Sequence, residues 1–210
     1  MGFLVLQRVA FSVGGHAEWF AVLEGDLRGQ PPLRPEEGTR WGTIADLDAL
    51  RDLGRDEALV RDRFAQGDRA ALLQTDQPIA SSWYRSGWYD EQGILFELGP
   101  AEVWGYDGWV ASDHRGRGHY AALIGWASAA LASEGVSRVL VAIDHLNRPS
   151  LRAARASGRR PLGSVWMVRA FGVSVRRVSW HAWPRWQVYR GARPVAVPPG
   201  RRERGEGRTV

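Results

Sequence analysis

The chain has 210 residues, of which 44% are hydrophobic and 24% charged, which fits one globular domain and excludes two large ones. It contains no Cys, which excludes disulfides, thiolate nucleophiles and Cys-based metal sites. All 28 basic side chains are Arg, and the formal net charge is +5. Residues 176–210 carry nine Arg against two Glu, so the positive charge belongs to the C-terminal end.

No segment has the pattern of a signal peptide or of a membrane span. The apolar run at residues 3–6 is broken by Gln7 and Arg8, with no basic region before it and no cleavage site after it. Later stretches fall short of the roughly 18 consecutive apolar residues that a membrane helix needs. We therefore expect a cytoplasmic protein that makes no membrane contact and holds no metal.

Three parts are predicted along the chain. Residues 1–39 form an extension, with strands at 4–9 and 18–23, that packs onto the edge of the main domain. Residues 40–190 form that domain, and residues 191–210 form a basic, disordered tail. A solvated tail is a simpler interpretation than a nucleic-acid contact, so nucleic-acid binding is not expected. A homodimer formed through the extension is left open.

The domain begins with two helices and continues with strands. Thr43 and Asp46 have the spacing of a capping box, which predicts a helix that ends at Gly54. A second helix is predicted over residues 56–65. Turn residues then separate four strands that read as an antiparallel meander, at residues 71–75, 79–84, 94–98 and 103–112.

The second half of the domain reads as a crossover followed by closing strands. Apolar residues at helical spacing from Tyr120 to Leu131 predict a helix, and a buried strand follows at 139–143. This strand and 103–112 are then parallel neighbours joined by a right-handed crossover. A short helix from Pro149 to Gly158 precedes strands at 165–170 and 173–179.

An anion site is predicted where the crossover helix begins, at Arg115-Gly116-Arg117-Gly118. The first N–H groups of a helix lack partners and lie at the positive end of its dipole. The two glycines let the backbone approach a pyrophosphate closely, and the two arginines add positive charge. A Gly/Arg turn alone is also common in ordinary loops, so its place between strand and helix carries the prediction.

At these residues the chain resembles the GCN5-related N-acetyltransferases. The acetyl-CoA signature of that family is Gln or Arg, two residues, Gly, one residue, then Gly or Ala. Arg115 and Gly118 match it. Tyr120 stands where the family has the final small residue, which is a departure from the pattern.

Two further segments carry the resemblance. Asn147 and Ser150 match the family's second motif, Asn, two residues, Ser or Ala, with Gly158 at the end of the short helix that follows. Residues 40–47 look like the first strand and helix of the family. The resemblance therefore covers about residues 40–170 in the right order, which is more specific than any single motif.

The resemblance implies an α/β fold with a mixed, mostly antiparallel sheet, a central splayed parallel pair and about four flanking helices. It further implies acetyl-CoA as the acyl donor, the primary amine of a small molecule or peptide as acceptor, and direct attack of the amine. The pantetheine arm would lie between the central strands that end at Ser112 and Ile143. The implied cofactor-binding residues are Val110, Ser112, Arg115, Gly116, Arg117, Gly118, His119, Tyr120, Asn147 and Ser150.

Three catalytic candidates lie on the strand that leads to Val110. Glu102 and Asp107 are candidate bases for the proton of the amine, because relatives often carry an acidic residue there, and Tyr106 is a candidate donor. The alternative is that Asp107 and Tyr106 only occupy the solvent face of a strand. Many relatives have a Tyr in the last helix that protonates the leaving thiolate, but the matching position here is Ala154.

Several alternatives stay open. His114 and His119 lie near the predicted phosphate site, yet each also fits a solvated loop or helix-start residue. The aromatic residues of the meander fit core packing, with a minority forming an acceptor wall: Trp83, Tyr84, Trp88, Tyr89, Trp104, Tyr106 and Trp109. For function, the alternatives are transfer of a longer acyl or aminoacyl group and a non-catalytic CoA-binding module.

Overall fold

In the computed structural model, residues 16–28, 35–91, 94–171 and 173–179 are described, together with the backbone of residues 185–189 and 195–196. The strand predicted at residues 4–9 and most of the predicted disordered tail lie outside these ranges. Within them, no helix combines the length and the apolar character that crossing a membrane requires.

A nine-stranded sheet forms the centre of the molecule, in the order β11-β10-β9-β1-β8-β7-β4-β3-β2. Its one parallel pair among the described strands is β7 with β8, and the other neighbours are antiparallel. This is the predicted mixed α/β fold. The strands are β1 (His16–Asp26), β2 (Thr39–Trp41), β3 (Arg69–Gln74), β4 (Pro78–Ser86), β7 (Glu102–Val110), β8 (Arg138–Asp144), β9 (Arg160–Ala170), β10 (Val173–Val178) and β11 (Arg185–Tyr189).

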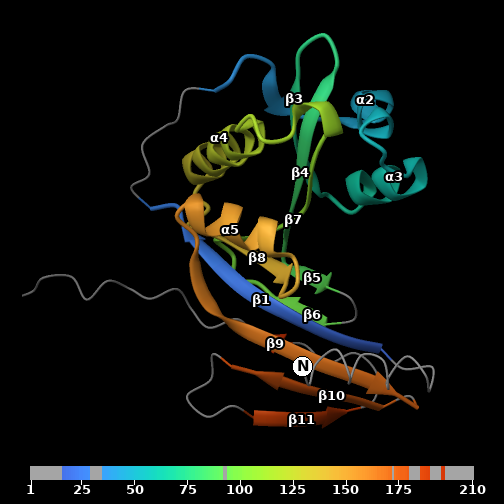
Figure 1. Ribbon diagram of the computed structural model, residues 1–210, viewed down its shortest axis with the longest axis vertical. Helices are drawn as coiled ribbons and strands as arrows, with labels where there is room; N and C mark the ends of the chain where they lie inside the picture. Colours follow the sequence, from blue (N-terminus) through green and yellow to red (C-terminus); the bar gives the residue numbers. More distant parts are fainter. Residues whose placement is uncertain are drawn as a thin grey trace, which may run out of the picture.

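Four α-helices are described: α2 (Leu47–Asp52), α3 (Glu57–Ala65), α4 (His119–Ser133) and α5 (Arg148–Ala156). In Figure 1, α2 and α3 lie on one side of β3 and β4, and α4 lies on the other. The predicted capping box is confirmed, since Thr43 and Asp46 cap each other's backbone at a 3-10 helix over Ile44–Asp46 that leads into α2. Because α4 connects parallel β7 to β8, the predicted crossover is also confirmed.

The core has separate clusters on the two faces of the sheet. On one face, Leu123, Ala127 and Leu131 of α4 pack with Leu151 and Ala154 of α5. On the other face, α2 and α3 bring Leu50, Leu53 and Val60 against β3 and β4. The apolar faces of all four helices are thus buried, which fixes the N-terminus of α4 at the end of β7.

The position of β1 corrects the prediction that the N-terminal extension packs onto the edge of the domain. β1 lies inside the sheet, with Leu23 opposite Val141 of β8 on one side and Trp19 opposite Trp166 of β9 on the other. The cause is visible in its burial, since Phe20 and Val22 belong to one core cluster and Leu23 to another. A strand that is apolar on both faces belongs in the interior of a sheet.

A small second sheet corrects the predicted four-strand meander. β4 pairs directly with β7, while β5 (Trp88–Glu91) and β6 (Ile94–Glu97) form a hairpin that pairs with β12 (Val195–Ala196). Ile94 and Phe96 are fully buried against Trp104 and Leu140, so this hairpin covers the sheet instead of extending it. The pairing of β12 also gives a fixed place to two residues of the predicted disordered tail.

Candidate active site

The two parallel strands of the sheet separate along their length. β7 and β8 pair from Glu102 opposite Arg138 to Trp104 opposite Leu140. Beyond that point, no pairing joins residues 105–110 to residues 141–144. We call this separation the gap. It confirms the predicted splay of the central parallel pair, and in Figure 1 the strands diverge into an upper and a lower part of the molecule.

A bulge in β7 lies beside the gap. Trp83 of β4 faces Tyr106, and Ser81 faces Trp109, so two residues of β7 stand opposite one of β4. One of them, Asp107, has a φ of 46°, a backbone conformation that costs free energy in a non-glycine residue. A bulge of this kind bends the strand and ends regular pairing.

Two arginines hold this strained residue. Arg55 lies 2.7 Å from one carboxylate oxygen of Asp107, and Arg63 lies 2.6 Å from the other. Arg55 also stacks on the ring of Trp109, with its guanidinium carbon 4.7 Å from the ring centroid. The loop after α2 and the last turn of α3 therefore anchor the bulge from the face opposite α4.

The inner end of the gap lies at Gly105. A Cβ atom there would meet Val141 Cγ1 at 3.3 Å and Val139 Cγ1 at 3.4 Å. The valines of β8 thus fill the space where the strands begin to part. From this point the gap runs past Gly108 to Val110.

A cavity of about 300 Å³, which we call the cavity, adjoins the outer end of the gap at Val110. It lies between the end of β7, the first turns of α4 and the last turn of α5. Its lining residues are Val110, His114, Arg115, Gly116, Gly118, His119, Tyr120, Ala121, Ile124, Ala153, Ala156 and Ser157.

The N-terminus of α4 faces this cavity without a cap. Gly118 is the N-cap residue, with a φ of 87°, and as a glycine it has no side chain that could cap the helix. Within the described part of the chain, the amides of residues 116–121 donate to no other group. Arg115 adds positive charge, its Nε donating to the carbonyl of Val110 at 3.1 Å. Free amides and a nearby guanidinium are the elements of a phosphate site.

Six of the ten predicted cofactor residues line the cavity, and four do not. Ser112 begins a 3-10 helix over Ser112–His114 and donates to Asp113. The side chain of Arg117 is exposed. Asn147 caps α5 by accepting from the amide of Ser150 at 3.2 Å, so these two residues orient the helix that forms the cavity wall.

Residues in and just after α5 complete the lining of the cavity, and they were not predicted from the sequence as site residues. Ala153, Ala156 and Ser157 are three and four positions apart, so they share a face of the helix. Their small size is the one signal that could have found them. Two lining histidines are anchored: His119 Nδ1 lies 2.8 Å from a carboxylate oxygen of Glu36, and His114 Nε2 lies 3.2 Å from Gln77 Nε2.

The three catalytic candidates lie in different places. Glu102 is at the paired end of the strands, where it contacts Arg138 and accepts from the amide of Gly99 at 2.9 Å. Tyr106 and Asp107 lie at the bulge. The Tyr106 hydroxyl donates to Asp68, and burial together with this bond raises its pKa. Only Tyr106 and Asp107 therefore come near the gap.

The aromatic residues of the predicted meander divide by burial. Trp83, Tyr84 and Trp104 are fully or almost fully buried and belong to the core. Trp88 and Trp109 keep 48% and 40% of their surface exposed. The exposed rings that are left for the predicted acceptor wall therefore lie near the bulge and the hairpin.

The comparisons with known proteins agree with this geometry. No protein-family model matches the chain, and no curated protein matches its sequence. Among solved structures, a putative GNAT-family acetyltransferase from Novosphingobium aromaticivorans has a TM-score of 0.55 at 16% identity, over 74% of this chain and 66% of that one. A GCN5-related N-acetyltransferase from Sphaerobacter thermophilus has a TM-score of 0.51 at 16% identity, over 91% and 58%.

A third match is a GCN5-related N-acetyltransferase from Kribbella flavida, with a TM-score of 0.51 at 13% identity, over 80% of this chain and 64% of that one. The chain thus covers 58% to 66% of the length of these three proteins. At sequence identities of 13% to 16%, the similarity to these structures shows a shared fold and no more than that. The resemblance predicted from the motifs is confirmed at that level: the chain has the fold of the GCN5-related N-acetyltransferases.

Proposed function

We propose that the protein is an acyltransferase that moves an acetyl group from acetyl-CoA to the primary amine of a small molecule or peptide. The observation that carries the proposal is that the cavity and the gap adjoin at Val110: uncapped amides at the N-terminus of α4 face the cavity, and from Val110 the stretch of β7 without pairing to β8 leads away from it. The first feature suits a diphosphate, and the second suits an extended arm that carries amide groups.

The donor substrate fits the residues that are present. Its diphosphate would accept from the free amides around Gly118, with Arg115 supplying positive charge. Its pantetheine arm would occupy the gap, where the backbone groups of residues 105–110 have no partner from β8. The thioester would then lie between Val110 and the closed inner end at Gly105.

The reaction proposed is direct attack of the amine on the thioester carbonyl. A C–N bond forms, the C–S bond breaks, and the products are an amide and a thiol. Holding the two reactants together in one site supplies a large part of the rate increase. The role of Asp107 as the base stays a prediction, and its two arginine partners favour a second role, which is to hold the bulge in place.

The test is turnover with the purified protein, acetyl-CoA and a panel of primary amines, followed by thiol release. We expect CoA to bind by calorimetry and thiol release to depend on the amine. Failure of CoA to bind would contradict the site itself. Binding of CoA with no turnover on any amine would instead favour the non-catalytic CoA-binding module, for which Ala154 in place of a tyrosine is the supporting observation.

Chain length of the acyl group needs a separate measurement. Donors with acetyl, butyryl and octanoyl groups would be compared at saturating amine. We expect acetyl to be preferred, because valines from β8 already fill the inner end of the gap. Faster transfer of the longer groups would favour the alternative of a longer-chain acyltransferase.

A further inference from the structure

Tyr120 is the residue at which the chain departs from the acetyl-CoA signature, and its side chain lies against the bulge. A Cβ atom on Gly108 would come within 2.7 Å of Tyr120 Cε2 and closer still to the hydroxyl oxygen. The phenol therefore lies directly over the backbone of Gly108. Only a residue without a side chain at position 108 leaves room for it there.

This contact places the hydroxyl beside the path of the acyl donor. Gly108 lies between Val110, which lines the cavity, and Gly105, where the gap closes. An arm that enters from the cavity must end within this stretch of β7. The reacting thioester and the Tyr120 hydroxyl would then be neighbours.

Thioester cleavage creates a need for a proton at this point. The departing thiolate has the basicity of an ordinary thiol, with a pKa of about 8.5, so a donor that protonates it as the C–S bond breaks lowers the barrier. The helix position that supplies a tyrosine in relatives is Ala154 here, and that residue is buried in the core.

Other groups near the cavity are already engaged. The hydroxyl of Ser157 donates to the carbonyl of Ala154 at 2.8 Å. His119 is paired with Glu36, and His114 lies against Gln77. Within the described part of the chain, the Tyr120 hydroxyl makes no hydrogen bond, and Tyr120 itself lines the cavity.

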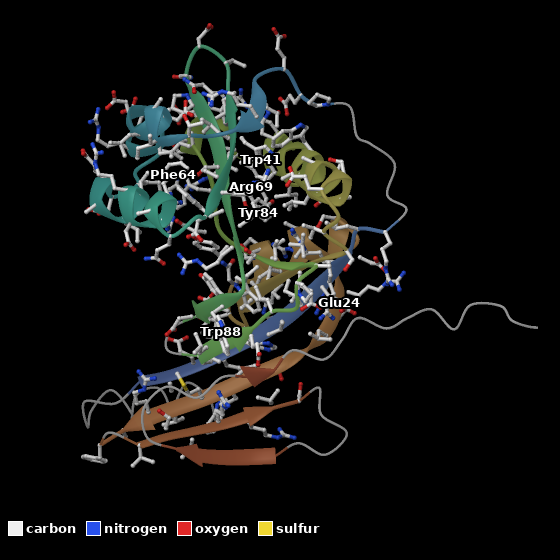
Figure 2. All side chains as sticks on the ribbon, turned by 180° about the vertical axis from the view of Figure 1, so that it is seen from behind. Glu24, Trp41, Phe64, Arg69, Tyr84 and Trp88 are labelled. Atoms are coloured by element: carbon white, nitrogen blue, oxygen red, sulfur yellow. The ribbon has the colours of Figure 1, made fainter. Side chains whose placement is uncertain are left out.

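The other phenols near the gap are engaged or shut away, since the Tyr106 hydroxyl donates to Asp68 and Tyr84 does not line the cavity. Tyr84 is 2% exposed and packs edge-on against Trp41, and Figure 2 shows both residues in the same part of the molecule, together with Arg69. Burial and the neighbouring Tyr120 raise the pKa of Tyr84 to about 12. Tyr84 is a core residue and does not line the cavity.

We infer that the Tyr120 hydroxyl donates the proton to the departing thiolate, an inference that rests on the proposed acetyl transfer. The C–S bond breaks, its electron pair stays on sulfur, and sulfur takes the phenolic proton. The nitrogen that came from the amine still carries an extra proton after the attack. The phenolate takes this proton, directly or through water, which leaves the neutral amide. The overall exchange is amine plus thioester to amide plus thiol.

Tyr120→Phe tests the inference, with Tyr84→Phe as the matched control. Removing a general acid costs about 100-fold or more in turnover, so kcat of Tyr120→Phe should fall by about this factor. The dissociation constant of CoA and the KM for acetyl-CoA should stay within about twofold, because the ring remains in place. Tyr84→Phe should keep kcat within about twofold.

Gly108→Ala provides a second test that keeps the hydroxyl but displaces it. Its kcat should fall, and adding Tyr120→Phe should cause little further loss, because both changes remove the same group. Full additivity of the two losses would overturn the inference. So would a Tyr120→Phe variant with unchanged kcat, or one whose only defect is weaker CoA binding. Absence of turnover in the wild-type protein would instead reject the proposed function.

Discussion

The two ends of the β7–β8 pair differ in whether their backbone groups pair with the neighbouring strand: at the closed end β7 and β8 are hydrogen-bonded to each other, and at the open end they are not. At the closed end, Arg138 is 4% exposed and lies between two carboxylates, at 2.9 Å from Glu24 and in contact with Glu102. Val103, Trp104, Val139 and Leu140 pack there in the core. At the open end, β7 carries Gly105, Gly108 and the strained Asp107, and pairing with β8 stops.

This difference shows how one strand can serve both the fold and the site. Buried backbone groups need partners, and the closed end supplies them within the sheet. In the proposed function the open end leaves them to the acyl donor, and the structure around it is held by groups outside the pair, namely Arg55 and Arg63 on one face and α4 on the other. The stability of the domain and its proposed chemistry can therefore be changed separately.

The largest effect is expected from breaking the closed end with Arg138→Met. This change leaves Glu24 and Glu102 without their buried cation, and removing one partner of a buried ion pair costs about 3–5 kcal/mol. Urea unfolding should show this loss. Arg61→Met is the control, since Arg61 and Glu57 form an exposed helix pair whose loss should cost about 0.5 kcal/mol or less. Equal urea midpoints for Arg138→Met and Arg61→Met would contradict the expectation that the buried ion pair contributes more stability than the exposed one.

At the open end, Gly118→Val should lower CoA affinity by about 100-fold, because a branched side chain occupies the approach to the free amides. Gly135→Val is the matched control at the other end of α4, since Gly118 has a φ of 87° and Gly135 a φ of 90°. Apart from the adjoining residues, a Cβ atom at either position would meet no atom within 4 Å, so the control imposes a similar backbone strain far from the cavity. Calorimetry should find weak CoA binding for the first variant alone, and equal affinities would count against the site.

The same chemical change at both ends of β7 should have different consequences. Asp107→Asn loosens the bulge and should lower turnover by about 10-fold with little change in CoA affinity. Glu102→Gln should keep turnover within about twofold and reduce stability instead, because Glu102 contacts Arg138 at the closed end. Steady-state kinetics and thermal unfolding measure both. Unchanged turnover in both variants would remove these carboxylates from the mechanism.

Local signals made much of this fold predictable. The capping box at Thr43 and Asp46 and the apolar spacing of the crossover helix from Tyr120 to Leu131 each depend on residues close in sequence. The turn from Arg115 to the start of α4 was also predictable, because the signals for a helix start after a strand lie in one short stretch, while its role as an anion site stays a prediction.

Features that depend on distant residues were not predictable. The pairing of β1 with β8 joins residues more than 100 positions apart, and nothing in the pattern of β1 specifies its neighbours. The anchoring of Asp107 needs Arg55 and Arg63 from another part of the chain. The contribution of Ala153 and Ala156 has no chemical signature, because alanines in a helix are equally suited to packing.

The smallest expected effect concerns the hairpin that covers the closed end, where Tyr89 and Phe96 stack on Trp104. Burial, together with the nearby Glu18 carboxylate, raises the pKa of Glu91 from 4.5 to about 7. Between these two values the folded protein holds a proton that the unfolded chain has released, so the free energy of unfolding should fall as the pH rises through this range. The expected change is on the order of 1 kcal/mol, since the side chain is only partly buried.

Glu91→Gln removes the titrating group and should flatten this part of the stability profile. Urea unfolding of both proteins at pH 4.5, 5.5, 6.5 and 7.5 would measure the difference, with turnover recorded at the same pH values. Because the hairpin packs on the closed end, the substitution should change stability without changing CoA affinity. A profile of the variant that still falls over this range would assign the titration to another group, and a loss of CoA affinity would show that the two ends of the strand pair are coupled.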